Sequence, residues 1–92
     1  MEYIYILKSL NFPKTYTGHT HDLINRLRQH NNGYSKFTNK YKPWEIIHSE
    51  VCDNSIRARV REKYLKSSSG RRWIKKNIFS RINNRCVLNK PR

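Results

Sequence analysis

Two β-type segments near the start of the chain constrain its fold most. Residues 3–7 read Tyr-Ile-Tyr-Ile-Leu, a run of aromatic and β-branched side chains that favours an extended strand. Residues 15–17 (Thr-Tyr-Thr) form a second such segment that ends at Gly18, and Pro13 in the link between them is typical of a turn. Two strands joined by so short a polar link predict an antiparallel hairpin.

One helix and one further strand are expected in the middle of the chain. Asp22 is a suitable N-cap for a helix over residues 23–31, which carries leucines four positions apart and ends at Asn-Asn-Gly. Residues 33–43 are polar and turn-rich, so no regular structure is expected there. Residues 44–51 read as a third strand.

The second half of the chain predicts two helices and a tail. Residues 56–66 carry apolar side chains at four-residue steps, which indicates a helix, and a Ser-Ser-Ser-Gly run separates it from a short helix over residues 71–79. Residues 80–92 show no period and no acidic residue, so we expect a flexible basic tail after a domain of residues 1–79. Strands followed by helices predict a small α+β fold. The apolar side chains at four-residue steps are Ile56, Val60 and Tyr64.

Charge narrows the class of partner. The 92 residues include 20 Lys and Arg against six Asp and Glu, a net charge of +14, and residues 55–92 contain Glu62 as their single acid. This favours a polyanionic partner, with nucleic acid first and an anionic membrane surface second. The longest apolar run has five residues, too short to span a bilayer. No secretory signal is recognised, and the two cysteines form no CxxC pair, so we expect a cytoplasmic protein without disulfides.

Several residues suited to phosphodiester chemistry follow one another in a fixed order. A Tyr-Ile-Tyr tripeptide ends at Tyr5, and a Tyr-Thr-Gly tripeptide begins at Tyr16. Arg26 and His30 share one face of the next helix, distinct from its leucines, and Glu62 lies on a later helix. This order resembles the GIY-YIG nuclease family, which is named for two such tripeptides on adjacent strands. The opening glycine is replaced here by tyrosine and the isoleucine of the second tripeptide by threonine, and the resemblance covers roughly residues 3–79.

The resemblance implies a fold and a reaction. The fold is a three-stranded antiparallel sheet with helices packed on its faces. The reaction is hydrolysis of a DNA phosphodiester with one divalent metal ion, Mg²⁺ or Mn²⁺. Small stand-alone bacterial members look similar, as does the N-terminal nuclease domain of the excision-repair incision protein, which implies a role in DNA repair or recombination. The catalytic roles carry over to Tyr5, Tyr16, Arg26, His30, Glu62 and Asn77.

The chemistry of Glu62 fits a metal ligand. Ala58 and Leu65 flank it on the same helix, so its carboxylate should lie near the buried side, where it needs a cation. Mg²⁺ commonly takes one or two protein carboxylates together with waters and phosphate oxygens, so this single Glu is sufficient. The alternative is an ion pair between Glu62 and Lys66, four positions later.

The tyrosines and the arginine also have a chemical rationale. A phenol with a pKa near ~10 is a poor base at neutral pH. We expect a neighbouring metal and Arg26 to lower the pKa of Tyr5, so that it can act as the general base. Whether Tyr5 or Tyr16 is the base stays open. A guanidinium binds phosphate through two parallel hydrogen bonds, and the eight-residue offset from Gly18 selects Arg26 over Arg28 for the scissile phosphate.

The remaining expectations concern partners. An HxH pair at His19 and His21 lacks a second ligand pair with zinc-finger spacing, so no zinc site is expected. We expect DNA as substrate and, since no separate DNA-binding domain is evident, a protein partner that confers specificity. No membrane and no small-molecule cofactor are expected. The alternative function is a non-catalytic basic protein that binds DNA, RNA or the ribosome. The expected nucleic-acid contacts are Arg28, Lys36, Lys40, Lys42, Lys63, Lys66, Arg71, Arg72, Lys75 and Lys76.

Overall fold

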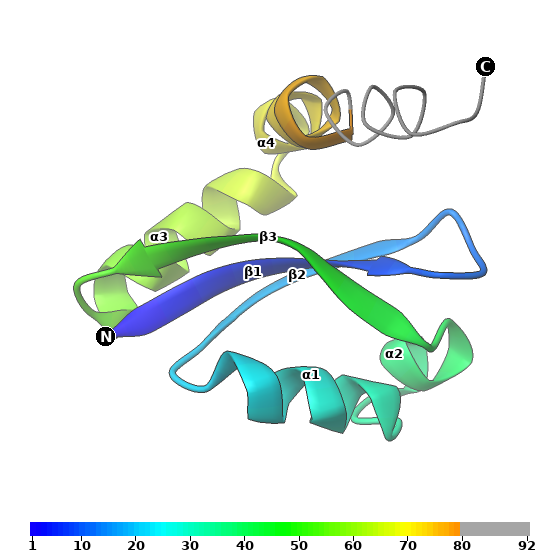
Figure 1. Cartoon of the computed structure of the whole chain (residues 1–92). Helices are drawn as coiled ribbons and strands as arrows, with labels where there is room; N and C mark the ends of the chain where they lie inside the picture. The colour runs from blue at the N-terminus through cyan, green and yellow to red at the C-terminus, as the bar shows by residue number, and fades with distance from the viewer. Residues whose placement is uncertain (80–92) are drawn as a thin grey trace, which may run out of the picture.

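Three strands and four α-helices form residues 1–79, the part of the chain that this computed structural model describes (Figure 1). The fold class is α+β, as the sequence predicts. No helix within residues 1–79 is long and apolar enough to cross a membrane. The elements are β1 (Glu2–Ser9), β2 (Thr15–Thr20), α1 (Leu23–Asn31), α2 (Lys36–Lys40), β3 (Trp44–Cys52), α3 (Ser55–Lys66), α4 (Ser68–Ile74) and the π-helical turn η1 (Lys75–Phe79).

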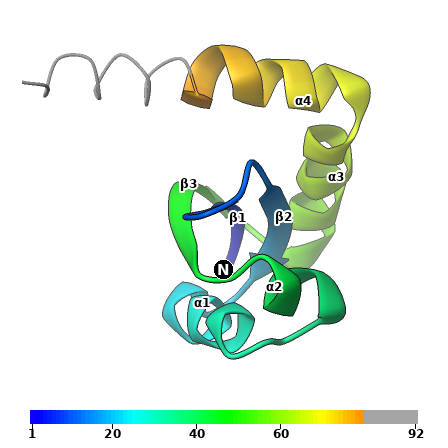
Figure 2. The same ribbon diagram turned by 90° about the vertical axis from the view of Figure 1, so that its right-hand side faces the viewer.

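The sheet has the order β2-β1-β3, and both strand pairs are antiparallel. The predicted hairpin is therefore present, and β1 is the central strand. Helices α1 and α2 lie on one side of the sheet, while α3 and α4 lie on the other (Figures 1 and 2). The expected three-stranded antiparallel sheet with helices on its faces is confirmed.

Alternation along β1 sends side chains into two separate cores. Ile4 and Ile6 face α3 and α4, where they pack with Ala58, Leu65 and Ile74. Tyr5 and Leu7 point the other way, toward α1 and α2, and form a second cluster with side chains of α1 and β3. Tyr5 belongs to this second cluster, so the strand that carries the first tripeptide is buried on both faces. The members of the second cluster are Tyr5, Leu7 and Trp44, with Tyr16, Leu23, Leu27, Tyr41 and Ile46 around them.

Helix α1 has the bounds that the sequence predicts, but α2 was not expected. The Asp22 side chain caps α1 by accepting a hydrogen bond from the backbone N–H of Asn25. In the segment predicted to be irregular, Ser35 and Thr38 form a reciprocal capping box around one helical turn. The buried Thr38 also accepts the indole N–H of Trp44 at its carbonyl oxygen, at 2.9 Å. This turn is stabilised by local capping, which an apolar periodicity does not reveal.

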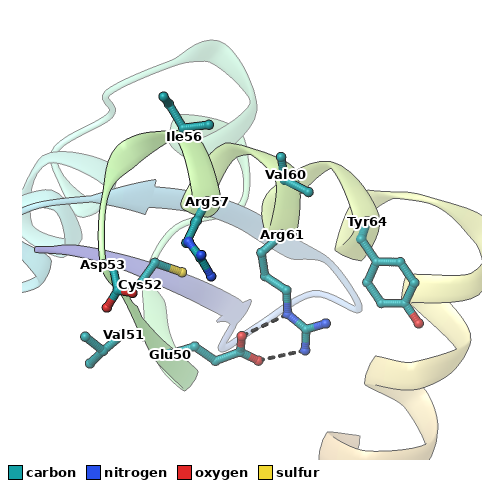
Figure 3. A pocket seen from close by; sticks show the side chains of 9 residues that line it. All are labelled: Glu50, Val51, Cys52, Asp53, Ile56, Arg57, Val60, Arg61 and Tyr64. Carbon is teal, nitrogen blue, oxygen red and sulfur yellow. Dashed lines mark hydrogen bonds and ion pairs between the residues drawn. The ribbon is translucent and has the colours of Figure 1, made fainter.

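The apolar stripe on α3 faces solvent, contrary to the usual reading of such a stripe as core. Ile56 is 72% exposed and Val60 is 66% exposed, and with Tyr64 they line an open pocket of about 550 Å³ beside the end of β3 (Figure 3). The small residue Ala58 and the single Leu65 form the buried face instead. Ala58 lies at the buried face because α3 packs closely against β1 and β2, and such a close contact favours a small side chain.

The edge strand β3 is joined to α3 by an arginine. The Arg61 guanidinium donates two hydrogen bonds to the Glu50 carboxylate, at 2.9 and 3.0 Å, as Figure 3 shows. The guanidinium carbon of Arg61 also lies 5.3 Å from the ring centroid of Tyr64 and 5.0 Å from that of Trp73. The Arg61 contact holds the pKa of the Glu50 carboxyl below its ordinary value. This ion pair gives Arg61, one of the basic residues of α3, a structural role that requires no bound ligand.

A single residue, Ser67, separates α3 from α4, whereas the sequence predicts that the whole Ser-Ser-Ser-Gly run separates them. Ser67 is the C-cap of α3, and its side chain accepts the backbone N–H of Gly70 as the N-cap of α4. A Cβ on Gly70 would lie 2.0 Å from the Tyr64 carbonyl oxygen and 2.4 Å from the Leu65 Cα, so only glycine fits there. The helix therefore begins at Ser68 rather than at residue 71. The expected basic tail, residues 80–92, lies outside the described residues.

Candidate active site

The two tripeptides meet at Tyr5 and Gly18, which are partners across the β1–β2 pair. The Tyr5 phenol lies over the Gly18 backbone on the α1 side of the sheet. A Cβ built on Gly18 would lie 2.6 Å from the Tyr5 Oη and 2.8 Å from its Cζ. Glycine at the end of the second tripeptide is therefore required by the path of the tyrosine that ends the first.

The Tyr5 hydroxyl is paired with His30 of α1. Its Oη lies 3.0 Å from the His30 Nε2, and both side chains are buried. Burial and the nearby Arg26 charge lower the pKa of His30 from 6.5 to about 4, so the imidazole is neutral at pH 7. No residue within 1–79 forms a hydrogen bond with the other ring nitrogen, Nδ1. A neutral imidazole with one hydrogen-bonded nitrogen is able to exchange a proton with the phenol.

The expectation of a lowered Tyr5 pKa is wrong for the protein without a bound metal. Burial raises the pKa of this phenol, and the neighbouring Tyr16 raises it further. Arg26 acts in the opposite direction, but its effect is smaller than that of desolvation. Tyr5 is therefore protonated at neutral pH, and a role as a base would require its own proton to leave first or at the same time.

Aromatic rings surround the Tyr5–His30 pair. The Tyr16 ring stacks on Tyr5 with centroids 6.3 Å apart, and its centroid lies 4.7 Å from that of His30. Tyr34 packs edge-on against His30 at 5.2 Å, and the Arg26 guanidinium carbon lies 5.1 Å from the Tyr34 centroid. Tyr5, Tyr16, Arg26 and His30 are thus brought into one cluster, which we call the tyrosine cluster.

Glu62 lies on the other side of β2, on the half-buried side of α3. One carboxylate oxygen, Oε2, accepts a hydrogen bond from Lys66 Nζ at 2.7 Å, and the other, Oε1, lies 3.5 Å from His19 Nε2. Lys66 connects this carboxylate to the tyrosine cluster, because its Nζ lies 5.8 Å from the Tyr16 ring centroid. Glu62 is also close enough to Tyr5 for its charge to contribute to the raised pKa of the phenol.

Comparison with known proteins agrees with this arrangement. Residues 1–77 match the model of the GIY-YIG catalytic domain. The chain belongs to the GIY-YIG family. It is 39% identical to a UPF0213 protein of Clostridium perfringens over 72% of this chain and 71% of the relative. It is 35% identical to a UPF0213 protein of Pediococcus pentosaceus over 88% of each chain. A UPF0213 protein of Staphylococcus saprophyticus is 34% identical over 79% of this chain and 89% of the relative. No solved structure matches the chain.

The carboxylate of this GIY-YIG protein fits a divalent cation. Glu62 is largely shielded from solvent, with 19% of its side chain exposed, and it forms the ion pair with Lys66 that the sequence offers as the alternative to a metal ligand. An oxygen donor in such a position suits Mg²⁺ or Mn²⁺, which take their other ligands from water and phosphate. No group of three or more His, Cys, Asp and Glu that could hold a metal ion occurs within residues 1–79, so an ion on Glu62 would need water and phosphate oxygens as its remaining ligands.

Two contacts of this GIY-YIG protein were missed by the sequence analysis. His19 Nδ1 forms a hydrogen bond with the Glu2 carboxylate at 3.1 Å, and its Nε2 lies 3.5 Å from Glu62 Oε1, so His19 lies between β1 and Glu62 of α3. Strand alternation could have placed His19 on the α3 face, opposite to Gly18. Tyr34 follows His30 by four positions beyond the end of α1, where no helical periodicity predicts a contact.

The other predicted residues have the following places. The Asn77 side-chain amide, in η1, donates to the Trp73 carbonyl oxygen at 3.0 Å. Arg28 is exposed on α1, away from the buried His30. The ten predicted nucleic-acid contacts are all exposed, on α1, around α2 and from α3 to η1. These contacts stay predictions.

Proposed function

We propose that this GIY-YIG protein is a metal-dependent endonuclease that hydrolyses a DNA phosphodiester bond. The hydrogen bond between the buried Tyr5 hydroxyl and the neutral His30 is the observation that supports the proposal most. The hydrogen bond satisfies two buried polar groups, and it also places a proton donor and a proton acceptor in contact, which is what activation of a water requires.

In this proposal Tyr5 is the general base and His30 accepts its proton. The phenol is protonated at rest, so its O–H bond breaks toward His30 Nε2 as its oxygen takes a proton from the attacking water. The water oxygen forms the new bond to phosphorus while the bond to the leaving oxygen breaks. The raised pKa of Tyr5 and the low pKa of His30 make this transfer uphill in the free protein, and for the same reason the imidazolium formed returns the proton readily once the phosphate has left.

Arg26 and Tyr16 position the phosphate in this proposal. The Arg26 guanidinium has no carboxylate partner within residues 1–79, so its hydrogen-bond donors are available to a non-bridging phosphate oxygen. There it would counter the charge that builds up in the transition state. The Tyr16 hydroxyl would donate a hydrogen bond to the same phosphate or to the water.

Glu62 would hold the divalent ion, Mg²⁺ or Mn²⁺. When bound, such an ion neutralises phosphate charge and polarises the bond that breaks. Lys66 would leave Glu62 at that point and become available to a phosphate. Asn77 and the ten basic residues are proposed as further contacts to the DNA, residues 80–92 as a basic tail, and the cytoplasm as the location, where a specificity-conferring protein could join the complex.

A nicking assay tests the proposal. Supercoiled plasmid and labelled duplex, flap, branched and single-stranded DNA are incubated with the protein and Mg²⁺ or Mn²⁺, with EDTA as control. We expect metal-dependent cleavage by the wild type, and loss of cleavage with retained binding for Tyr5→Phe. Binding of DNA or RNA without cleavage of any substrate would contradict the proposal and support the non-catalytic alternative.

A further inference from the structure

A groove follows β2 from the candidate active site toward the tip of the β1–β2 hairpin. It consists of two adjoining hollows of about 330 and 900 Å³, which share Thr15, Arg71 and Ile74 as lining residues. The smaller hollow reaches Tyr16 and Lys66, and the larger one reaches the hairpin and η1. In Figure 2, α3 lies beside β2 and α4 crosses above the sheet. We call these two hollows together the β2 groove.

The walls of the β2 groove are positively charged. Lys8, Lys66, Arg71 and Lys75 line it from four different elements, and no Asp or Glu of residues 1–79 lines it. The side chains of Arg71 and Lys75 are exposed and form no hydrogen bond or ion pair with any residue in that range. Two cationic groups are thus available to an anion, in a groove that begins at a residue of the tyrosine cluster.

The floor of the β2 groove is apolar and partly aromatic. Ile74 and Leu65 lie at its base, and the rings of Phe37, Tyr16 and Phe79 border it. Phe37 is 40% exposed although its ring contacts Tyr16, so part of its face is open to solvent. Cations beside a partly exposed aromatic ring are features that bind unpaired bases together with their phosphates. A duplex keeps its base faces inside its own stack, so it would leave these rings without a partner.

We propose that the β2 groove binds single-stranded DNA on one side of the scissile phosphate. The inference rests on the proposed function, which supplies DNA as the ligand, and deepens it by assigning an unpaired strand to this side of the active site. Arg71 and Lys75 bind successive phosphates, and Phe37 stacks on a base close to Tyr16. The substrate class is then DNA with a single-stranded portion next to the cleaved bond.

Binding measured in EDTA separates this inference from catalysis. The anisotropy of a fluorescent 20-nucleotide strand, and of the duplex of the same sequence, is recorded against protein over a range of salt concentrations. The test variant is Arg71→Ala with Lys75→Ala. The matched control is Arg72→Ala with Lys76→Ala, which removes the same two charges from the same helical segment at positions that do not line the groove.

The groove variant should bind the single strand less well than the control variant does. Losing two phosphate contacts should make the slope of log K against log salt shallower by about 1.4 for the single strand. The control should lower single-strand and duplex affinity by the same factor. Phe37→Leu should lose about fivefold in single-strand affinity, the equivalent of one weak stacking contact, with duplex affinity unchanged.

Equal losses in the two double variants would overturn the inference, since they would show general electrostatic attraction only. Tighter binding of the duplex, or of RNA of the same sequence, would also overturn it. Cleavage is scored separately. Groove-specific binding without cleavage of any DNA would contradict the proposed function alone, and cleavage without groove-specific binding would contradict this inference alone.

Discussion

Mild acid should destabilise the protein through His30. This side chain is fully buried, and its pKa falls from 6.5 in an unfolded chain to about 4 in the native protein. Between these two values the unfolded chain binds a proton that the native protein does not bind. The free energy of unfolding must therefore decrease as the pH falls from 7 toward 4, and the contribution is fully present only above the unfolded pKa.

The size of the effect follows from the two pKa values. Linkage gives a loss of about 2 kcal/mol in the free energy of unfolding between pH 7 and pH 5, and about 3 kcal/mol by pH 4. A second acid-sensitive group is Glu50, whose pKa is lowered by Arg61. The stabilising contribution of Glu50 is lost only as the pH falls below the ordinary pKa of a carboxyl group. The change in the free energy of unfolding between pH 7 and pH 5 therefore reports on His30.

Urea denaturation at pH 7 and pH 5 measures this contribution. The wild type and a control, His21→Gln, should each lose about 2 kcal/mol more than His30→Gln loses over the same interval. His21 is exposed, so it controls for the replacement of a histidine by glutamine, and the other histidines are common to the proteins compared. If His30→Gln loses as much stability as the wild type, His30 is not kept neutral by the fold, and the proton-acceptor role proposed for it loses its basis.

Four further outcomes are expected. Glu62→Gln should abolish nicking while binding in EDTA stays equal or tightens, because it removes the single acid of residues 55–92; nicking at ordinary Mg²⁺ would exclude this carboxylate from the site. Arg26→Ala should lower the turnover rate far more than the affinity for DNA. If Arg28→Ala lowered the turnover rate in the same assay and Arg26→Ala did not, contact with the scissile phosphate would belong to Arg28. Gly18→Ala should lower the unfolding free energy by about 1–3 kcal/mol in a urea titration, since its Cβ would lie 2.6 Å from the Tyr5 hydroxyl oxygen, and an unchanged stability would show that the phenol moves freely. Truncation after Phe79 should leave a folded domain whose DNA binding depends less steeply on salt, and an unchanged slope would show that the removed residues do not touch DNA.

Local patterns predicted the elements that depend on local physics. The bounds of α1 followed from the Asp22 cap, and the strands followed from β-branched and aromatic runs. Helix α2 was missed because its Ser35–Thr38 capping box is too short to leave a hydrophobic period. The apolar steps of α3 predicted the helix correctly but did not identify its buried face. Its three large side chains face solvent, while the sheet contact uses Ala58, whose small size carries no hydrophobic signal.

The candidate site was predictable in its membership but not in its energetics. The order of the tripeptides, Arg26 and Glu62 along the chain was sufficient to name them. The sequence could not show that Tyr5 is desolvated, because burial depends on how α1 packs over the sheet, and this reversed the expected direction of its pKa. The link from His19 to Glu62 was equally hidden, since it joins residues 43 positions apart through the packing of α3 against β2.

The glycine contact at the start of α4 has a consequence for how this chain can vary. Each residue added to or removed from a helix turns everything after it by about 100°. A one-residue insertion between Ser67 and Gly70 would place a serine side chain against the Tyr64 carbonyl oxygen, and a deletion there would place Arg71 against it. Neither fits where a Cβ would lie 2.0 Å from that oxygen. Insertions and deletions are therefore not tolerated at the junction of α3 and α4. The rotation of α4 about its own axis stays fixed as a result, and with it the position of Arg71 relative to Glu62.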